Sequence, residues 1–518
     1  MKNLDYSKTI KTAGFMAVTT ILAKVLGLVR DMILAAVYAT GPQATAFTAA
    51  TEVPLRLFDV VIGGVITAAF IPIYNSVLTK ENKEKAMKFA NDYVNGVLVV
   101  TLLLTFFGLL FNRWLIGFIA PGIDAPTTEL AISLSRIMFG MIIFTGLTYV
   151  FVGILNSNGE FYITSMLSVV FNIILIVYFI FFIKRGGILG LAITWVIAWA
   201  AQAFIQAPYL KKFQFKYKPT LQLNTPEMKM AIKLAVPILI SSWAPPVASL
   251  VNLRMSSYLN GGKAFTALSY SNKLYIVITG VFAFVASNLS FPYLAKAEAS
   301  GRKDEIKKMR GLLLIIITFI MAPIMVGLIL LALPIVRLAF ERGNFTAADS
   351  ALTATALMGC SFGMLAHSYN EILNKIFYAL RNSKTPMYTA MIGMGVNIVG
   401  SVILSRYMGI IGLGFAIALG YMITAILNLI WMSKELGDFG QRQEFIDLGK
   451  IALAVTLMGG AVFAIRGLFE GAPLGVLVPT GVGIVVYFVS CILLKVSAVW
   501  QFIDFVQAKL KRGEINGK

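Results

Sequence analysis

Charged residues inside an apolar stretch are the part of this sequence best suited to chemistry. Lys24, Arg30 and Asp31 lie in the segment of about residues 10–40, which is long enough to cross a bilayer. One Arg or Lys at the centre of a membrane helix costs about 2.5–3.5 kcal/mol on insertion scales, so it needs a partner, a watery cavity or a substrate. Arg30 and Asp31 can form a pair that only fixes helix packing, but Lys24 has no acidic neighbour within a turn. This asymmetry indicates an anion-binding cavity.

Three more ionisable residues share one face of the second apolar segment. Glu52, Arg56 and Asp59 stand at i, i+4 and i+7, a spacing that brings side chains together on a helix. The two carboxylates either neutralise the arginine within the segment or leave it for a substrate. Lys273, in a later apolar segment, adds a further base.

An excess of base within the membrane favours an anionic substrate. A pyrophosphate offers several acceptor oxygens for charge-assisted hydrogen bonds from Arg and Lys, whereas an exporter of organic cations would keep acidic residues there. The candidate substrate-binding residues are Lys24, Arg30, Lys273 and Arg56, and the candidate gate or ion-pair residues are Asp31, Glu52 and Asp59. We predict no catalytic residues, and hence no enzyme.

Composition sets the class of protein. Of 518 residues, 58% are hydrophobic and 13% are charged, which predicts an all-α polytopic membrane protein. The formal charge of +20 lies largely in short loops, so it indicates cytoplasmic loops and no nucleic-acid partner. One histidine and two distant cysteines exclude a multi-histidine metal site and a disulfide framework. No phosphate-binding Gly-x-x-x-x-Gly-Lys-Ser/Thr motif is present, so we expect no cofactor and a drive from the membrane potential, a monovalent cation or the substrate gradient.

Apolar runs predict fourteen transmembrane helices. A short repeat, Ala46-Phe47-Thr48-Ala49 and Ala264-Phe265-Thr266-Ala267, opens the second and eighth of them and predicts two parallel six-helix repeats, with the site between them. The predicted domains are 1–218 (N-lobe, helices 1–6), 219–440 (C-lobe, helices 7–12), 441–496 (helices 13 and 14) and 497–518 (a basic amphipathic cytoplasmic tail). The predicted spans are about 10–40, 45–79, 89–119, 127–155, 158–183, 187–210, 228–258, 263–295, 309–339, 347–380, 385–406, 409–433, 447–468 and 473–496.

Loop charges predict the orientation. Basic residues gather in alternate loops, for example at Lys80, Lys211 and Lys308, while Gly41–Ala44 has none. By the positive-inside rule both termini are cytoplasmic. Helices 13 and 14 are almost free of charge, so they either pack as filler or present an apolar groove to a lipid tail.

Motifs distributed along the whole chain carry a resemblance to a known family. They are Ala23-Lys24-Val25-Leu26-Gly27-Leu28-Val29-Arg30-Asp31, Ala69-Phe70-Ile71-Pro72, Tyr270-Ser271-Asn272-Lys273-Leu274, Gly343-Asn344-Phe345-Thr346 and Phe377-Tyr378-Ala379. With these motifs the sequence resembles the MurJ (MviN) lipid II flippases of the MOP exporter superfamily. The resemblance implies fourteen helices, a V-shaped pair of lobes around a cationic central cavity, and a tail held near helices 13 and 14. It also implies a bacterial cytoplasmic membrane, with membrane lipids and other cell-wall synthesis proteins as partners.

The resemblance implies a substrate as well, with departures at named positions. The family flips undecaprenyl-pyrophosphate-linked disaccharide-pentapeptide from the inner to the outer leaflet for peptidoglycan synthesis. Thr45 stands at the family's aspartate, Phe58 at its helix 2 arginine and Gly63 at its glutamate. Arg56 lies about 200° around the helix from Phe58, so whether it substitutes is open. Some family members bind sodium in the second lobe, for which Asn370 and Asn374 are the candidates here.

Three other functions stay open from the sequence. One is a flippase for another polyprenyl-pyrophosphate glycan, and a second is a cation-coupled exporter of drugs or small molecules on the same fold. The third is a membrane scaffold without transport. The cationic residues argue against the exporter of cations, and buried unpaired charge argues against the scaffold.

Overall fold

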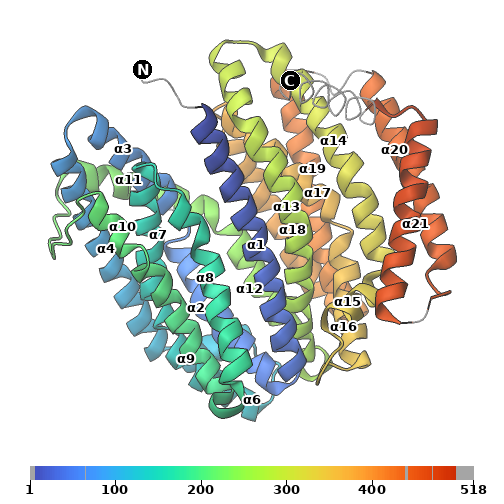
Figure 1. The fold of residues 1–518 in the computed structure, drawn as a ribbon, viewed down its shortest axis with the longest axis horizontal. Helices are drawn as coiled ribbons and strands as arrows, with labels where there is room; N and C mark the ends of the chain where they lie inside the picture. The colour runs from blue at the N-terminus through green and yellow to red at the C-terminus, as the bar shows by residue number, and fades with distance from the viewer. Residues whose placement is uncertain (1–5, 65, 438–441, 470, 498–518) are drawn as a thin grey trace, which may run out of the picture. The chain divides into compact units, whose positions relative to one another are not determined.

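The computed structural model describes residues 6–497 except 65, 438–441 and 470. In this part of the chain the regular secondary structure is helical and no strand occurs (Figure 1). The helices divide between two compact units, the first formed by Met1–Thr266 with Gly343–Phe345 and the second by Ala267–Arg342 with Thr346–Lys518. The all-helical secondary structure of the described residues confirms the predicted all-α class.

Unit 1 contains the first twelve α-helices and a π-helix. Glycines at 63 and 64 follow α2, and the chain resumes through the π-helix η1 into α3, so the second predicted span is a broken helix. Its elements are α1 (Tyr6–Tyr38), α2 (Pro42–Val61), η1 (Ile66–Phe70), α3 (Ile71–Lys80), α4 (Lys83–Leu110), α5 (Asn112–Ile119), α6 (Ala125–Met138), α7 (Met141–Ser157), α8 (Tyr162–Phe181), α9 (Ile183–Phe204), α10 (Ala207–Lys212), α11 (Pro226–Ser242), α12 (Ala244–Ser257) and the 3-10 turn η2 (Asn260–Gly262).

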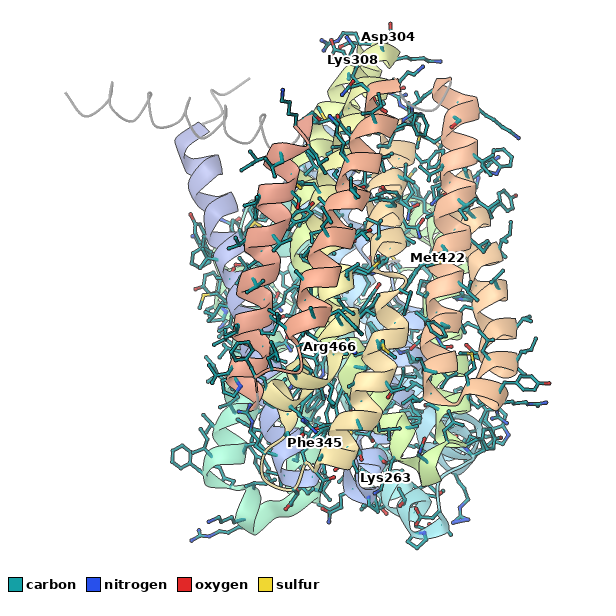
Figure 2. The ribbon with its side chains drawn as sticks, turned by 90° about the vertical axis from the view of Figure 1, so that its right-hand side faces the viewer. Lys263, Asp304, Lys308, Phe345, Met422 and Arg466 are labelled. Atoms are coloured by element: carbon teal, nitrogen blue, oxygen red, sulfur yellow. The ribbon has the colours of Figure 1, made fainter. Side chains whose placement is uncertain are left out.

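Unit 2 contains most of α13 and the helices that follow it. In Figure 2, Asp304 and Lys308 lie at one end of these helices and Arg466 lies toward the other. The elements are α13 (Lys263–Ala299), α14 (Lys303–Leu330), α15 (Ala332–Phe340), α16 (Ala347–Ser361), α17 (Met364–Ala379), α18 (Lys384–Met408), α19 (Ile410–Leu436), α20 (Arg442–Ile465) and α21 (Ala472–Leu493).

Every predicted span coincides with a helix or a broken helix. Within the described ranges, eight helices are long and apolar enough to cross a membrane, and a ninth span results if α6 and α7, bent by 41° at their junction, are one. The remaining predicted spans include α1, which carries Lys24, Arg30 and Asp31, and interrupted segments such as α11 with α12. The count of fourteen therefore stays a prediction. Of the predicted tail 497–518, residues 498–518 lie outside the described residues.

Short polar residues fix the ends of several helices. The Asn82 and Asp124 side chains cap α4 and α6, and Thr346 forms a capping box with Asp349 at the start of α16. Such caps satisfy backbone N–H groups that have no partner within the helix. They explain why these helices begin directly after short polar loops.

A glycine turn closes the end of α1. Gly343 has φ of +59°, and a Cβ built there would lie 2.4 Å from the carbonyl oxygen of Ala36, so a side chain would be strained and would collide. The next residue, Asn344, donates from its backbone to Ala36 O (2.8 Å) and from its side chain to Val37 O (2.7 Å). Within the motif at 343–346, Asn344 therefore caps α1, whereas Thr346 caps α16.

The two segments that contain the predicted repeat contact each other in unit 1. Thr45 precedes the first copy and Thr266 belongs to the second, and their hydroxyl oxygens lie 3.0 Å apart. Ala46, Ala264 and Phe265 are completely buried around this hydrogen bond. Small buried residues allow such close helix packing.

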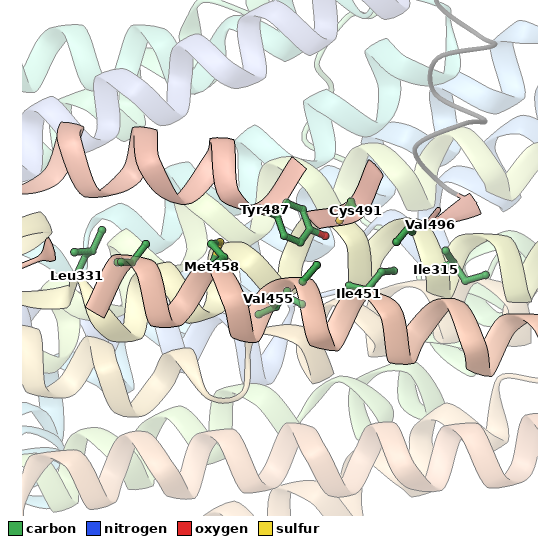
Figure 3. Packing of buried hydrophobic residues seen from close by; sticks show 11 residues of the cluster. Ile315, Leu331, Ile451, Val455, Met458, Tyr487, Cys491 and Val496 are labelled. Carbon is green, nitrogen blue, oxygen red and sulfur yellow. The ribbon is translucent and has the colours of Figure 1, made fainter. Parts of the chain in front are cut away.

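The core of unit 2 joins the two C-terminal helices to α14. Ile451, Val455 and Met458 of α20 face Tyr487 and Cys491 of α21, with Ile315 and Leu331 nearby (Figure 3). The Tyr487 hydroxyl donates to the backbone oxygen of Phe319 on α14 at 2.7 Å. One face of α20 and α21 is therefore packing surface, as one of the two sequence interpretations required.

Candidate functional site

A polar cavity of about 520 Å³ lies among three helices of unit 1. Helix α8 packs against both α1 and α9, and each of the three contributes one face to the cavity. The residues that line it are Thr20, Ala23, Lys24, Gly27 and Arg30 of α1, Thr164, Ser165, Ser168, Phe171 and Asn172 of α8, and Trp199 and Gln202 of α9. Two predicted bases thus share one cavity, and none of the residues that line it is acidic.

Arg30 is held in place from three sides. Its Nε and Nη2 donate to Asp31 Oδ1 at 3.1 and 2.9 Å, and its Nη1 donates to Asn172 Oδ1 at 2.9 Å. The guanidinium carbon lies 5.0 Å from the Trp195 ring centroid and 5.8 Å from that of Phe171. Aromatic faces within about 6 Å stabilise a cation in a partly desolvated place.

This geometry accommodates both interpretations of the Arg30–Asp31 pair. The ion pair forms, with side chains 13% and 5% exposed, so it does fix packing. Arg30 nevertheless lines the cavity. One carboxylate oxygen and one amide oxygen do not occupy all five N–H donors of its guanidinium. Its planar fork is therefore both oriented and available for an anion.

Lys24 lies on the same wall of the cavity as Arg30. The two bases are six positions apart in the sequence, about 9 Å along the axis of α1. Within the part of the chain that the structure describes, Lys24 forms no ion pair of 4.0 Å or less. Its ammonium group is a compact charge on a flexible stem, suited to following a multivalent anion.

The acidic and basic residues of α2 pair with one another. Arg56 Nε lies 2.9 Å from Glu52 Oε2, and Arg56 Nη1 lies 3.6 Å from Asp59 Oδ2. Phe58 is only 2% exposed and stacks on Tyr149, whereas the Arg56 side chain is 29% exposed. Arg56 therefore does not occupy the space of Phe58. Its role as a substrate contact, and the gate role of Glu52 and Asp59, stay predictions.

Lys273 belongs to unit 2. Its Nζ lies 5.5 Å from the ring centroid of Tyr270, one turn earlier on α13. Tyr270 is buried and its ring also contacts Phe340. The lysine is thus supported by an aromatic face, as Arg30 is, and its role in substrate binding stays a prediction.

The two sodium-site candidates join a network of amides in unit 2. Asn428 Nδ2 donates to Asn370 Oδ1 (3.1 Å) and to Asn374 Oδ1 (3.3 Å), and Asn428 Oδ1 accepts from Thr389 at 2.6 Å. Among the residues that the structure describes, no group of three or more His, Cys, Asp or Glu is placed to hold a metal. The amide oxygens already accept protein hydrogen bonds, so a sodium site at Asn370 and Asn374 stays a prediction. Asn428, their partner, was not foreseen.

An apolar groove of about 460 Å³ lies in unit 2, beside the packed core. It is formed by helices α14, α15, α20 and α21 with one residue of α13. The residues that line it are Ile278, Phe319, Ile320, Pro323, Ile324, Gly327, Leu328, Leu331, Ile335, Met458, Val462, Thr480, Gly483, Ile484, Tyr487 and Phe488. An apolar groove, part of the second interpretation of the last two helices, is therefore present, and its binding of a lipid tail stays a prediction.

Sequence reasoning missed the partners that shape the unit 1 cavity. Asn172 and Gln202 are polar residues within apolar helices, and Trp195 lies beneath Arg30. An uncharged amide inside a membrane span is the same kind of signal as a buried charge, although a weaker one. What the sequence lacks is the information that α8 and α9 lie against α1.

Comparisons with known structures first define the class. A structure of the lipid II flippase MurJ in an inward closed conformation superposes with a TM-score of 0.81 at 24% identity, covering 93% of this chain and 98% of that one. An inward-facing multidrug resistance MATE family transporter of the MOP superfamily superposes with a TM-score of 0.68 at 14% identity, covering 80% and 94%. The chain therefore has the all-helical fold of these two membrane-protein structures.

Sequence comparisons then define the family. The model of the family described as "Lipid II flippase MurJ" matches residues 34–482. The chain is 28% identical to a probable lipid II flippase MurJ of Buchnera aphidicola, over 87% of this chain and 89% of that protein. It is 26% identical to one of Thermotoga maritima, over 94% and 97%. This chain belongs to the MurJ family of lipid II flippases.

Proposed function

We propose that this protein flips lipid II, the undecaprenyl-pyrophosphate disaccharide-pentapeptide of peptidoglycan synthesis, from the inner to the outer leaflet by alternating access. Family membership supports the cargo. The observation that carries the mechanism is the unit 1 cavity, which contains two bases and is lined by no acid. In this proposal Lys24 and Arg30 bind the pyrophosphate in that cavity, and Lys273 of unit 2 remains a further candidate for binding the substrate.

Each base has a distinct task in this mechanism. Arg30 presents N–H donors in a fixed plane because Asp31, Asn172 and the Trp195 ring restrict its rotation. Lys24 adds a point charge about 9 Å away along α1, so a pyrophosphate can contact both. The apolar groove beside α20 and α21 accommodates part of the polyprenyl tail.

A cation-coupled drug exporter fits the cavity less well. Such an exporter needs negative charge where its cargo binds, and the residues that line this cavity supply only positive charge. A flippase for another polyprenyl-pyrophosphate glycan would use the same bases. No observation on unit 1 favours that alternative over lipid II.

The proposal also includes the orientation of the protein in the membrane and the energy source for transport. Both termini and the loop before α14 face the cytoplasm of a bacterial cell, because basic residues gather there. Moving one charge across 100 mV is worth about 2.3 kcal/mol, so the outward passage of an anion is favoured by an interior-negative potential. Coupling to this potential or to a monovalent cation, and contacts with other cell-wall synthesis proteins, belong to the same proposal.

Two experiments test the proposal. The gene should rescue cells depleted of their own lipid II flippase, and a gene carrying Arg30→Ala should not. Single cysteines at Lys308 and at Arg342, in a background without Cys360 and Cys491, should differ in labelling by an impermeant maleimide in intact cells. Labelling at position 308 but not at 342 would reverse the orientation, and failure of the unaltered gene to rescue would refute the cargo.

A further inference from the structure

The unit 1 cavity has a neutral polar side next to its two bases. Gln202 and Trp199 enter from α9, and three hydroxyl residues enter from α8. We propose that this side is a subsite for the sugar attached to the pyrophosphate, a hexose that bears hydroxyl and acetamido groups. The inference rests on the proposed function and adds a second recognised part of the substrate.

Gln202 is the main evidence. It is 6% exposed and lines the cavity, and its amide group makes no hydrogen bond to any of the residues that the structure describes. Only its backbone oxygen is engaged, by Gln206 Nε2 at 3.0 Å. Neither polar atom of this amide is among the fully enclosed side-chain atoms without a partner, so the amide is accessible from the cavity, where a ligand or water can satisfy it. The Nε1 atom of the neighbouring Trp199 is enclosed and has no partner among the described residues. A primary amide both donates and accepts, as sugar hydroxyl and acetamido groups require.

The hydroxyl residues of α8 complement this amide. Thr164, Ser165 and Ser168 stand at i, i+1 and i+4, and all line the cavity. Thr164 donates to Asn156 Oδ1 at 2.9 Å and Ser165 donates to Tyr162 O at 2.8 Å, so their oxygens retain lone pairs for incoming donors. Ser168 is exposed to the cavity, and no hydrogen bond of its hydroxyl occurs within the described residues.

Aromatic rings supply the apolar component of a sugar site. Trp199 and Phe171 line the cavity and contact each other with ring centroids 5.5 Å apart and planes at 61°. A sugar ring has polar edges and apolar C–H faces, so it suits a pocket with aromatic walls and a few placed polar groups. The Phe171 ring centroid also lies 5.8 Å from the Arg30 guanidinium carbon, so Trp199 is the ring whose face is left for a sugar.

The size and charge of the cavity agree with one sugar. Its volume of about 520 Å³ falls within the range of about 300–1,000 Å³ typical of small-molecule sites. That space suits one hexose with its phosphate but not a complete disaccharide-pentapeptide. Lys24 and Arg30 line the same cavity, so a sugar bonded to the pyrophosphate reaches the neutral side without a spacer.

The test compares two probes on the full-length protein in lipid nanodiscs. One probe is undecaprenyl pyrophosphate, and the other is the same lipid carrying one N-acetylhexosamine. We expect Gln202→Leu to weaken binding of the sugar-bearing probe by roughly threefold to tenfold, the value of a lost neutral hydrogen bond, and to leave the bare pyrophosphate unchanged. Ser168→Ala should act in the same direction, and Ser133→Ala, an exposed serine of α6, is the matched control.

The outcomes separate this inference from the proposed function. Equal effects of Gln202→Leu on both probes, or no effect on either, would overturn the sugar subsite while Arg30→Ala still weakens both. If Arg30→Ala changes neither probe, or the unaltered protein binds neither, the pyrophosphate site fails and the subsite fails with it. If Gln202→Leu does not accumulate, the comparison of Ser168→Ala with Ser133→Ala decides.

Discussion

The polar cavity of unit 1 and the apolar groove of unit 2 are similar in volume and opposite in chemistry. The first, about 520 Å³, is lined by two bases, hydroxyls and amides, and the second, about 460 Å³, is lined almost entirely by hydrocarbon and aromatic carbon. A small soluble metabolite would need only the first, and an ordinary lipid tail only the second. Together they suit an amphiphile with an anionic head and a long apolar tail. Substitutions at four positions test whether the cavity acts only on the anionic head and the groove only on the apolar tail.

The largest effect is expected in the cavity. Arg30→Ala should abolish flipping, and Arg30→Lys should leave partial activity because lysine lacks the planar fork. Loss of one charge-assisted contact costs roughly 1.5–3 kcal/mol, which reduces occupancy about tenfold or more. Lipid II translocation and crosslinking should be measured at matched expression, with Arg406→Ala at an exposed end of α18 as control. A well-expressed Arg30→Ala protein that still transports would refute the pyrophosphate site. A lower abundance of the variant, with unchanged transport per molecule, would show that Arg30 only stabilises helix packing.

A charge in the groove should have the next largest effect. Ile484 lines the groove and is 52% exposed, whereas its neighbour Val485 is 62% exposed and does not line it. An arginine at either position costs a similar insertion energy of about 2.5–3.5 kcal/mol. We therefore expect Ile484→Arg to reduce flipping of a long-chain substrate severalfold more than Val485→Arg does. Equal activity of the two variants would exclude the groove from tail binding.

Lys24 should be more tolerant of replacement than Arg30. It has no partner that fixes its direction among the described residues, so charge alone matters, and Lys24→Arg should be nearly neutral. Lys24→Ala should reduce substrate affinity by about tenfold, the value of one charge-assisted contact. Both affinities can be measured with undecaprenyl pyrophosphate. If Lys24→Ala binds as tightly as the unaltered protein, Arg30 acts without it.

The smallest effect on flipping is expected from a change at Tyr487, which lines the groove. The Tyr487 hydroxyl donates to Phe319 O, so Tyr487→Phe should lower the stability of unit 2 by about 1 kcal/mol and leave flipping unchanged. Thermal unfolding and translocation assays on the same preparation measure both quantities. A selective loss of transport without a loss of stability would show that the groove also recognises substrate through a polar group.

Features encoded locally could be predicted from the sequence. The ranges of the helices follow from apolar runs, and the α2 ion pairs follow from the spacing of their residues. The groove follows from the absence of charge between Ile451 and Ile465 of α20 and throughout α21. Long-range partners could not be predicted in this way. Asn172 lies 142 residues from Arg30, and the Trp195 ring beneath Arg30 comes from a third helix, so only packing brings them together. Asn428, which engages both sodium-site candidates, was missed for the same reason.

The cap on α1 has a consequence for how the protein is made. Asn344 satisfies the last carbonyl groups of α1, although it follows Val37 by 307 positions. A ribosome synthesises about 5–20 residues per second, so α1 enters the membrane many seconds before its cap exists. Until residue 344 has been synthesised, the carbonyl groups of Ala36 and Val37 must accept hydrogen bonds from water or from the membrane insertion machinery. Unit 1, with the cavity that α1 lines, therefore reaches its final form only after part of unit 2 has been synthesised.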